Sequence, residues 1–183
     1  RGFGGWRPLF WRLMLDANVD LEYTGSSSEH KCAEDVDPHR GHTFQPWHEG
    51  AWSARSDEQR DKVVSHLAAG TYACQPTCVT IHLGTNDVCQ KNGALPPTTY
   101  SNLIELINSL QSQPRRGGAS DDLVETTVLL AAPIPCCNYA GGIASLRSLL
   151  LRDAAALAQR RVFIVDQYEG FNLFNMTDDG CHP

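Results

Sequence analysis

The chain has 183 residues, of which 42% are hydrophobic and 20% are charged. These values exclude a disordered chain and provide enough apolar surface for a sizeable core. A net charge of −6 argues against a nucleic acid or an anionic membrane as partner. No segment approaches the ~20 consecutive apolar residues of a membrane span. We expect a single domain over residues 1–183.

The first third of the chain contains two helical patterns separated by a long polar segment. Apolar residues recur at helical spacing over 8–14, next to a proline in the first turn. Residues 19–23 alternate between apolar and polar side chains, which predicts a short strand. The polar loop over 25–50 is long enough to indicate a functional or cross-linked segment. Residues 57–69 begin with acidic side chains and carry an apolar stripe, which predicts a helix.

The remainder of the chain alternates between strand and helix patterns. We expect strands over 78–83, 127–132 and 162–165, and helices over 99–113 and 143–159. This alternation predicts a parallel sheet with helices on both faces. In sheets of this kind ligands bind at the carboxyl ends of the strands. Residues that directly follow a strand are therefore the first candidates for a site.

Seven cysteines are many for a cytosolic protein of this size: Cys32, Cys74, Cys78, Cys89, Cys136, Cys137 and Cys181. Their scatter predicts disulfides, an oxidising compartment and a secreted protein. Buried thiols are the alternative. The spacing between Cys74 and Cys78 does not match a zinc-ligand pattern, so we expect neither a metal nor another cofactor.

The turn Gly84-Thr85-Asn86-Asp87 directly follows the apolar strand pattern. At this position the Asn86 amide can donate a hydrogen bond to an oxyanion. Gly84 has no side chain, so a substrate can approach its backbone closely. A simple Asn/Asp turn is an equally good interpretation of these four residues taken alone.

Near the end of the chain, Asp179 and His182 are three residues apart. One turn can bring the carboxylate to one imidazole nitrogen and leave the other nitrogen facing a cleft. That arrangement would fix the histidine tautomer and stabilise the imidazolium when the base takes a proton. A surface turn with a solvated histidine is the simpler interpretation of this spacing.

Taken together and in this order, the two motifs resemble those of the SGNH, or GDSL-type, hydrolase family. The turn over 84–87 resembles its Gly-x-Asn-Asp block, and 179–183 resembles its Asp-x-x-His block with the trailing proline. Residues 3–9 resemble the segment that follows the family's nucleophile. The resemblance covers essentially the whole chain, and in detail it is greatest to the carbohydrate-esterase branch that deacetylates polysaccharides such as xylan.

The resemblance implies a three-layer α/β/α, flavodoxin-like domain that hydrolyses carboxylic esters through a Ser-His-Asp acyl-enzyme. His182 would be the general base, Asp179 its orienting acid and Asn86 an oxyanion donor. The expected partner is a small-molecule or polysaccharide ester.

The chain departs from the family at two blocks. The Gly-Asp-Ser block with the nucleophile is absent, and alignment places it just before Arg1. We therefore expect a domain truncated at its N-terminus, and also at its C-terminus, that lacks its first strand and is inactive by itself. At the second block, alignment puts Ser53 at the oxyanion glycine, whereas a shift of three residues would put Gly50 there. Trp47 and Trp52 can form a wall on which a sugar ring stacks, and packing within the loop is an equally good interpretation.

No other serine is expected to replace the nucleophile, since Ser26, Ser27 and Ser28 lie in a polar loop without a strand-to-turn context. Two alternatives to an esterase remain open. The first is a hydrolase-derived module that binds carbohydrate without cleaving it. The second is a flavodoxin-like cofactor domain, for which Gly141-Gly142 is the candidate phosphate loop, although the pair lacks a phosphate-binding pattern.

Overall fold

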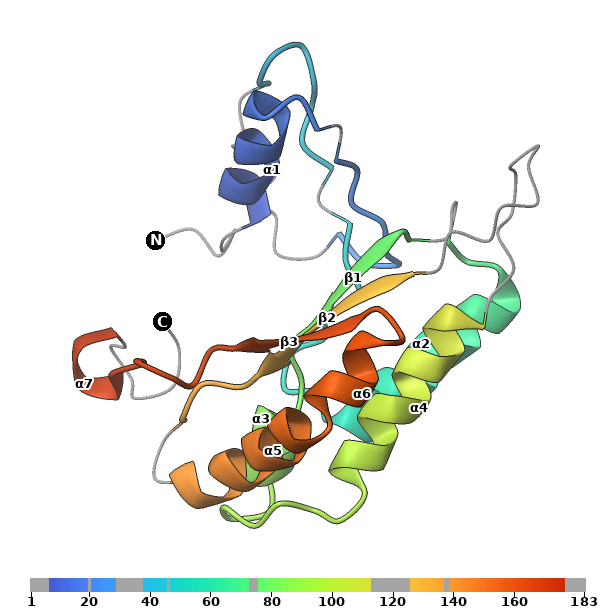
Figure 1. Ribbon diagram of the computed structural model, residues 1–183. Coiled ribbons are helices and arrows are strands. Elements are labelled where there is room, and N and C mark those ends of the chain that lie inside the picture. Colours follow the sequence, from blue (N-terminus) through green and yellow to red (C-terminus); the bar gives the residue numbers. More distant parts are fainter. Residues whose placement is uncertain are drawn as a thin grey trace. The chain divides into compact units, whose positions relative to one another are not determined.

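The computed structural model describes residues 7–19, 21–28, 38–45, 47–72, 76–112, 126–136 and 139–176. The chain divides into two compact units (Figure 1). The first comprises residues 1–50 and 70–73, and the second comprises 51–69 and 74–183.

A three-stranded parallel sheet forms the centre of the second unit. Its strands are β1 (Cys78–Ile81), β2 (Thr127–Ala132) and β3 (Val162–Asp166), in the order β1-β2-β3. In the register of the sheet, Leu130 pairs with Ile81 on one side and with Ile164 on the other. The parallel sheet and the α/β class predicted from the alternating pattern are confirmed.

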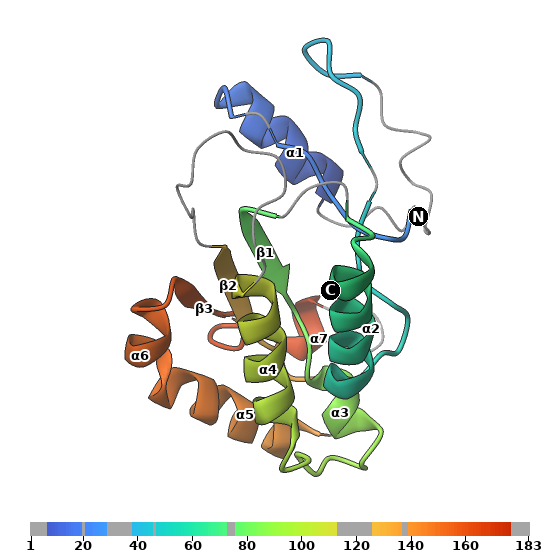
Figure 2. The same cartoon turned by 90° about the vertical axis from the view of Figure 1, so that its right-hand side faces the viewer.

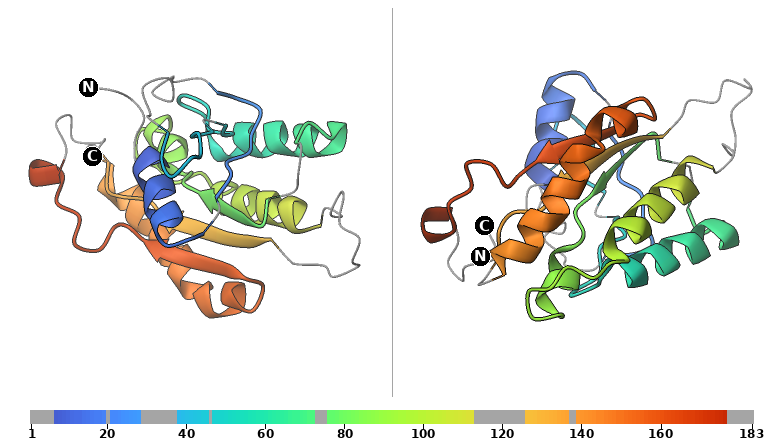
Figure 3. Two further views of the ribbon diagram at one scale, coloured as in Figure 1. Left: turned by 90° about the horizontal axis from the view of Figure 1, so that it is seen from above. Right: turned by 60° about the horizontal axis from the view of Figure 1, so that its bottom comes forward.

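The helices of this unit are α2 (Ser56–Ala69), α3 (Thr85–Cys89), α4 (Thr99–Gln111), α5 (Ala140–Arg152), α6 (Ala154–Ala158) and α7 (Leu173–Met176). Helices α2 and α4 run side by side (Figures 1 and 2). Together with α5 and α6 they lie on the same side of the sheet, which the right panel of Figure 3 shows from below. Helices on both faces were expected, and these four cover one face.

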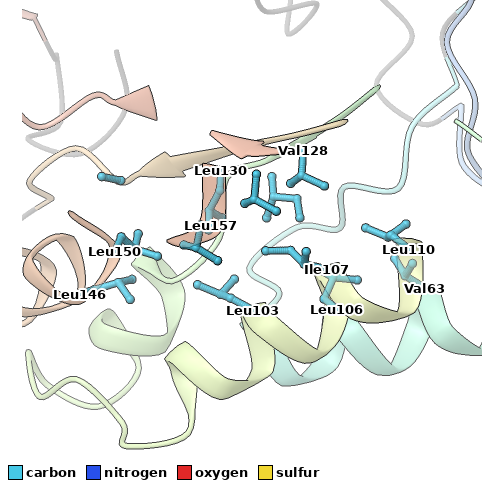
Figure 4. Close-up of a cluster of buried hydrophobic side chains, with 13 residues drawn as sticks. Val63, Leu103, Leu106, Ile107, Leu110, Val128, Leu130, Leu146, Leu150 and Leu157 are labelled. Carbon is cyan, nitrogen blue, oxygen red and sulfur yellow. The ribbon is translucent and has the colours of Figure 1, made fainter. Parts of the chain in front are cut away.

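The hydrophobic core lies between this helical layer and the sheet. Leu103 and Ile107 of α4 pack with Leu130 of β2 and Leu146 of α5, and all four are fully buried (Figure 4). The residues of β3 alternate in exposure, so that Val162 is buried whereas Phe163 is 45% exposed. In β3 the side chains on one face are therefore covered by the helical layer, although the strand itself is a continuous apolar run.

The predicted helix over 143–159 is two helices in the structure. The chain turns at Asp153, whose carboxylate accepts hydrogen bonds from Arg152 (2.7 Å) and from the Tyr100 hydroxyl (2.6 Å). The first of these bonds is the main reason that the pKa of Asp153 lies below its usual value. The Asp153 side chain makes no capping hydrogen bond to the backbone, so its partners at the break are the Arg152 and Tyr100 side chains.

The first unit contains α1 (Arg7–Asp16), which confirms the helix expected near Pro8. The buried face of this helix was predicted wrongly. Trp11 and Leu15 are buried with Phe44, whereas Leu9 and Leu13 of the expected apolar stripe are exposed. Among the described residues of 19–23 no strand forms.

The cysteine prediction is met at one position and not at two others. Cys136 is disulfide-bonded, whereas Cys78 and Cys89 are not, and the sulfur of Cys89 lies 3.8 Å from that of Cys136. Cys32, Cys74, Cys137 and Cys181 lie outside the described residues, and no disulfide joins two cysteines within them. Over the same residues, no helix combines the length and the apolar character that a bilayer crossing requires.

Candidate active site

The carboxyl ends of the three parallel strands lie at one edge of the sheet. Gly84 follows β1 at this edge and Pro133 follows β2, while Gln167 follows β3 and donates its backbone N–H to Ala132 (3.2 Å). This is the edge at which open α/β sheets bind ligands.

Residues 84–87, expected as a turn, form the start of helix α3. Gly84 precedes the helix with a φ of +108°, and a Cβ atom at this position would clash with Leu146 of α5. Its backbone angle and this close packing explain the glycine. The approach of a substrate to Gly84 is not needed to explain it and stays a prediction.

A second glycine contact places α3 against α5. A Cβ atom on Gly142 would clash with the carbonyl oxygen of Gly93, which follows α3, and would crowd Val88 within it. Gly142 and Val88 are both buried. The pair Gly141-Gly142 thus lies in the first turn of α5, and close packing explains why residue 142 is glycine. This weakens the interpretation of the pair as a phosphate-binding loop.

Three side chains at α3 hold the loop that leads into α2. The Asn86 amide donates to the carbonyl oxygen of Ala54 (3.1 Å), and the Gln90 amide donates to that of Ser53 (2.9 Å). Asp87 accepts a hydrogen bond from the backbone N–H of Ser56 (2.9 Å). The structure therefore brings together two of the predicted site residues, Asn86 and Ser53, at the carboxyl end of β1.

Ser53 adopts a left-handed backbone conformation with a φ of +56°. This region favours glycine and is uncommon for other residues. Gly50, the alternative at this position, is not among the glycines with positive φ and belongs to the first unit. Ser53 therefore has a backbone conformation that glycine adopts without strain, and its role as an oxyanion donor stays a prediction.

Asp87 is a functional candidate that the sequence analysis did not single out. Its side chain is 3% exposed and accepts three hydrogen bonds, from the N–H and hydroxyl of Ser56 and from the Thr99 hydroxyl (3.1 Å). Asn102 in turn donates to the Ser56 hydroxyl (3.1 Å). A buried carboxylate with three donors in the first turn of a helix is a structural anchor.

Arg55 extends this arrangement at the surface. It forms two hydrogen bonds with Asp57 (3.0 and 3.1 Å) and one with the Gln90 side-chain oxygen (3.1 Å). The hydrogen bonds from Arg55 are the main reason that the pKa of Asp57 lies below its usual value. Trp52, immediately before Ser53, is 77% exposed.

Asp179 and His182 lie outside the described residues, so their predicted roles stay predictions. Within the described part of the chain, no cluster of three or more His, Cys, Asp or Glu side chains is placed to hold a metal ion.

The sequence matches no protein-family model and no curated protein. Its fold, in contrast, is similar to solved structures. One is a serine-to-alanine mutant of an acetyl esterase, crystallised with an acetate ion. It is 21% identical, with a TM-score of 0.75 over 97% of this chain and 81% of the other.

Two further structures are family 3 carbohydrate esterases. That from Talaromyces cellulolyticus is 20% identical, with a TM-score of 0.74 over 97% of this chain and 81% of the other. That from Clostridium thermocellum is 22% identical, with a TM-score of 0.67 over 98% and 77%. The resemblance predicted from the motifs is thus confirmed at the level of the fold, and the chain folds as these carbohydrate esterases do.

Proposed function

We propose that the protein is a secreted carboxylic ester hydrolase that removes acetyl groups from a carbohydrate. The observation that carries this proposal is the hydrogen bond from the Asn86 amide to Ala54, directly after the left-handed Ser53, at the carboxyl end of β1. The similarity to structures described as acetyl and carbohydrate esterases supports the same substrate class.

The two residues offer donors of the kind that an oxyanion needs. The Asn86 amide has two N–H groups, and the carbonyl of Ala54 takes one of them, which fixes the amide and leaves the other to donate. The Ser53 N–H accompanies it as a backbone donor. Donors that are fixed before the reaction stabilise a developing oxyanion without reorganisation.

In the proposed reaction a serine hydroxyl attacks the acetyl carbonyl while His182 takes its proton, and Asp179 stabilises the imidazolium. The negative charge on the carbonyl oxygen is stabilised by Asn86 and Ser53. The imidazolium then protonates the leaving sugar oxygen, and water hydrolyses the acetyl-serine by the same route. Trp52 offers an exposed ring on which a sugar can pack.

The nucleophilic serine is proposed to lie outside these 183 residues. Ser56, which is close to the donors in sequence, is 1% exposed and donates its hydroxyl to Asp87. A hydroxyl that is buried and already donating to a carboxylate stabilises the fold and is not free to attack a substrate.

The test uses the protein expressed from the full reading frame that contains this chain, with p-nitrophenyl acetate and acetylated xylan as substrates. His182→Ala should lower kcat by several orders of magnitude because the general base is lost. His39→Ala is the matched control, since His39 also pairs with an aspartate, Asp16, at 2.8 Å, but in the other unit. Wild-type turnover by His182→Ala would contradict the assignment of the base, and carbohydrate binding without any hydrolysis would favour the binding module.

A further inference from the structure

We infer that Gln90 is a positioning residue that keeps Ser53 in its left-handed conformation and so directs the loop that carries the proposed oxyanion donor. The inference rests on the proposed function for its catalytic consequence. The stabilisation of the loop by Gln90 does not depend on the proposed function and can be measured without a substrate.

Gln90 contacts both ends of the tripeptide 53–55. Its Nε2 atom donates to the Ser53 carbonyl (2.9 Å), and its Oε1 atom accepts from Nη1 of Arg55 (3.1 Å). Asn86, one helical turn earlier, holds the middle carbonyl, that of Ala54 (3.1 Å). The tripeptide is therefore fixed at three successive residues by side chains from one short segment.

The orientation of the Gln90 amide is determined by its two partners. The Arg55 guanidinium can only donate hydrogen bonds, so the amide oxygen of Gln90 must face it. The Ser53 carbonyl can only accept, so the amide nitrogen of Gln90 must face that carbonyl. Arg55 is itself held by two hydrogen bonds to Asp57. No other rotation of the Gln90 amide satisfies both neighbours.

Ser53 needs such a hold because its backbone conformation is unfavourable for a residue with a Cβ atom. Left-handed serine persists where surrounding contacts determine the backbone. If the Gln90 contact is lost, the loop can relax toward negative φ, which would rotate the peptide groups on both sides of Ser53. A shift of this kind near the reacting atoms is costly for the rate.

The replacement of Ser53 by glycine provides the decisive comparison. Glycine adopts positive φ without strain, so a loop in the Ser53→Gly variant should not depend on Gln90. A purely structural role for Gln90, such as support of the end of α3 by its backbone N–H (3.0 Å to the Asn86 carbonyl), predicts no such rescue.

The experiment compares Gln90→Glu, Ser53→Gly and the double variant in the protein expressed from its full reading frame. Glutamate keeps an acceptor for Arg55 and removes the donor to Ser53. Gln111→Glu is the matched control. The Gln111 amide also donates to backbone carbonyls, of Thr126 (3.1 Å) and Arg160 (2.7 Å), but these lie at the amino ends of β2 and β3.

We expect Gln90→Glu to lower kcat for p-nitrophenyl acetate by roughly 10- to 100-fold with little change in KM. Amide hydrogen exchange over residues 51–56 should become faster, and both changes should be reversed by Ser53→Gly in the double variant. Gln111→Glu should change neither quantity.

Three results would overturn the inference. If exchange over 51–56 is unchanged in Gln90→Glu, the side chain does not hold the loop. If exchange rises but kcat is unchanged, or if Ser53→Gly does not restore kcat, the hold has no catalytic consequence. Failure of the proposed function itself would be recognised separately, because wild-type and His182→Ala proteins would then be equally inactive while the exchange measurement still reports on Gln90.

Discussion

The carboxyl ends of β1 and β3 hold the chain that follows them in different ways. After β1, a buried carboxylate and two neutral amides fix the loop over 53–56. After β3, Arg147 of α5 forms three hydrogen bonds to Asp166 and one to Glu169 (2.9 Å), and its guanidinium lies 5.3 Å from the ring centre of Tyr168.

The two regions differ in how far their charged side chains are exposed to solvent. Asp87 is 3% exposed, whereas the side chains of Arg147 and Asp166 are 26% and 27% exposed. Interactions between exposed charges are screened by salt, and buried hydrogen bonds are screened much less. The end of β1 should therefore keep its geometry as the salt concentration changes, whereas the segment after β3 should respond to salt. The proposed oxyanion donors, Asn86 and Ser53, lie at the carboxyl end of β1, whose geometry should not depend on salt.

The largest expected effect concerns Asn86. Asn86→Ala should lower kcat by roughly 10²–10³, equivalent to about 2.7–4 kcal/mol of transition-state stabilisation. Steady-state kinetics with p-nitrophenyl acetate measure it, and a melting curve shows whether the fold is kept. If kcat falls by less than about threefold, Asn86 only anchors Ala54, because the loss of an oxyanion donor lowers kcat far more.

The second effect concerns Asp87. Asp87→Ala leaves the N–H and hydroxyl of Ser56 and the Thr99 hydroxyl without their acceptor. Unsatisfied buried donors should lower the free energy of unfolding by about 3 kcal/mol or more. Urea denaturation measures this, with Asp61→Ala as the control. The exposed ion pair of Asp61 with Arg60 should contribute no more than about 1 kcal/mol. Equal losses in the two variants would contradict the anchoring role of Asp87.

The smallest effect concerns the ion cluster after β3. Hydrogen bonds from Arg147 are the main cause that lowers the pKa of Asp166 below its usual value. A carboxylate with a lowered folded-state pKa contributes stability that is present above its unfolded pKa of about 3.9 and is lost as the pH falls through the folded value. Arg147→Gln should therefore lower the Tm slightly at neutral pH, and the difference from the wild type should shrink in acid and at high salt.

Arg152→Gln is the control for this last measurement. Arg152 also forms two hydrogen bonds with an aspartate, Asp153, on the same stretch of chain, but it does not contact the segment after β3. Both variants should show a similar salt dependence, whereas only Arg147→Gln should increase hydrogen exchange over residues 167–172. If exchange there is unchanged, the Arg147 cluster does not hold that segment.

The sequence predicted the regular elements where one physical signal dominated. The strand over 127–132 and the strongly amphipathic helix from Thr99 were located to within about two residues. A continuous apolar run marks the strand, and burial of one face imposes a clear period on the helix. The turn over 84–87 was misread, since α3 is too short for a periodic pattern and is stabilised by packing. The apolar stripe of α1 was also misread, because Leu9 and Leu13 have the right spacing but do not pack inside.

Of the site, the sequence pointed to Asn86 and Ser53 but to neither Asp87 nor Gln90. Their partners in the loop lie more than thirty residues earlier in the chain, and such contacts leave no local pattern. The left-handed conformation of Ser53 could be anticipated only from the alignment, which places this residue where glycine is expected. Serine itself does not indicate a positive φ.

The packing of α3 against α5 at Gly142 has a consequence for the engineering of this protein. A Cβ atom at position 142 would clash with the Gly93 carbonyl and crowd Val88, so α3 and α5 would have to move apart. A displacement of α3 would carry Asn86 and Gln90 with it. Library designs that sort positions by distance from the chemistry would class residue 142 as scaffold, yet a side chain there should lower turnover as well as thermal stability.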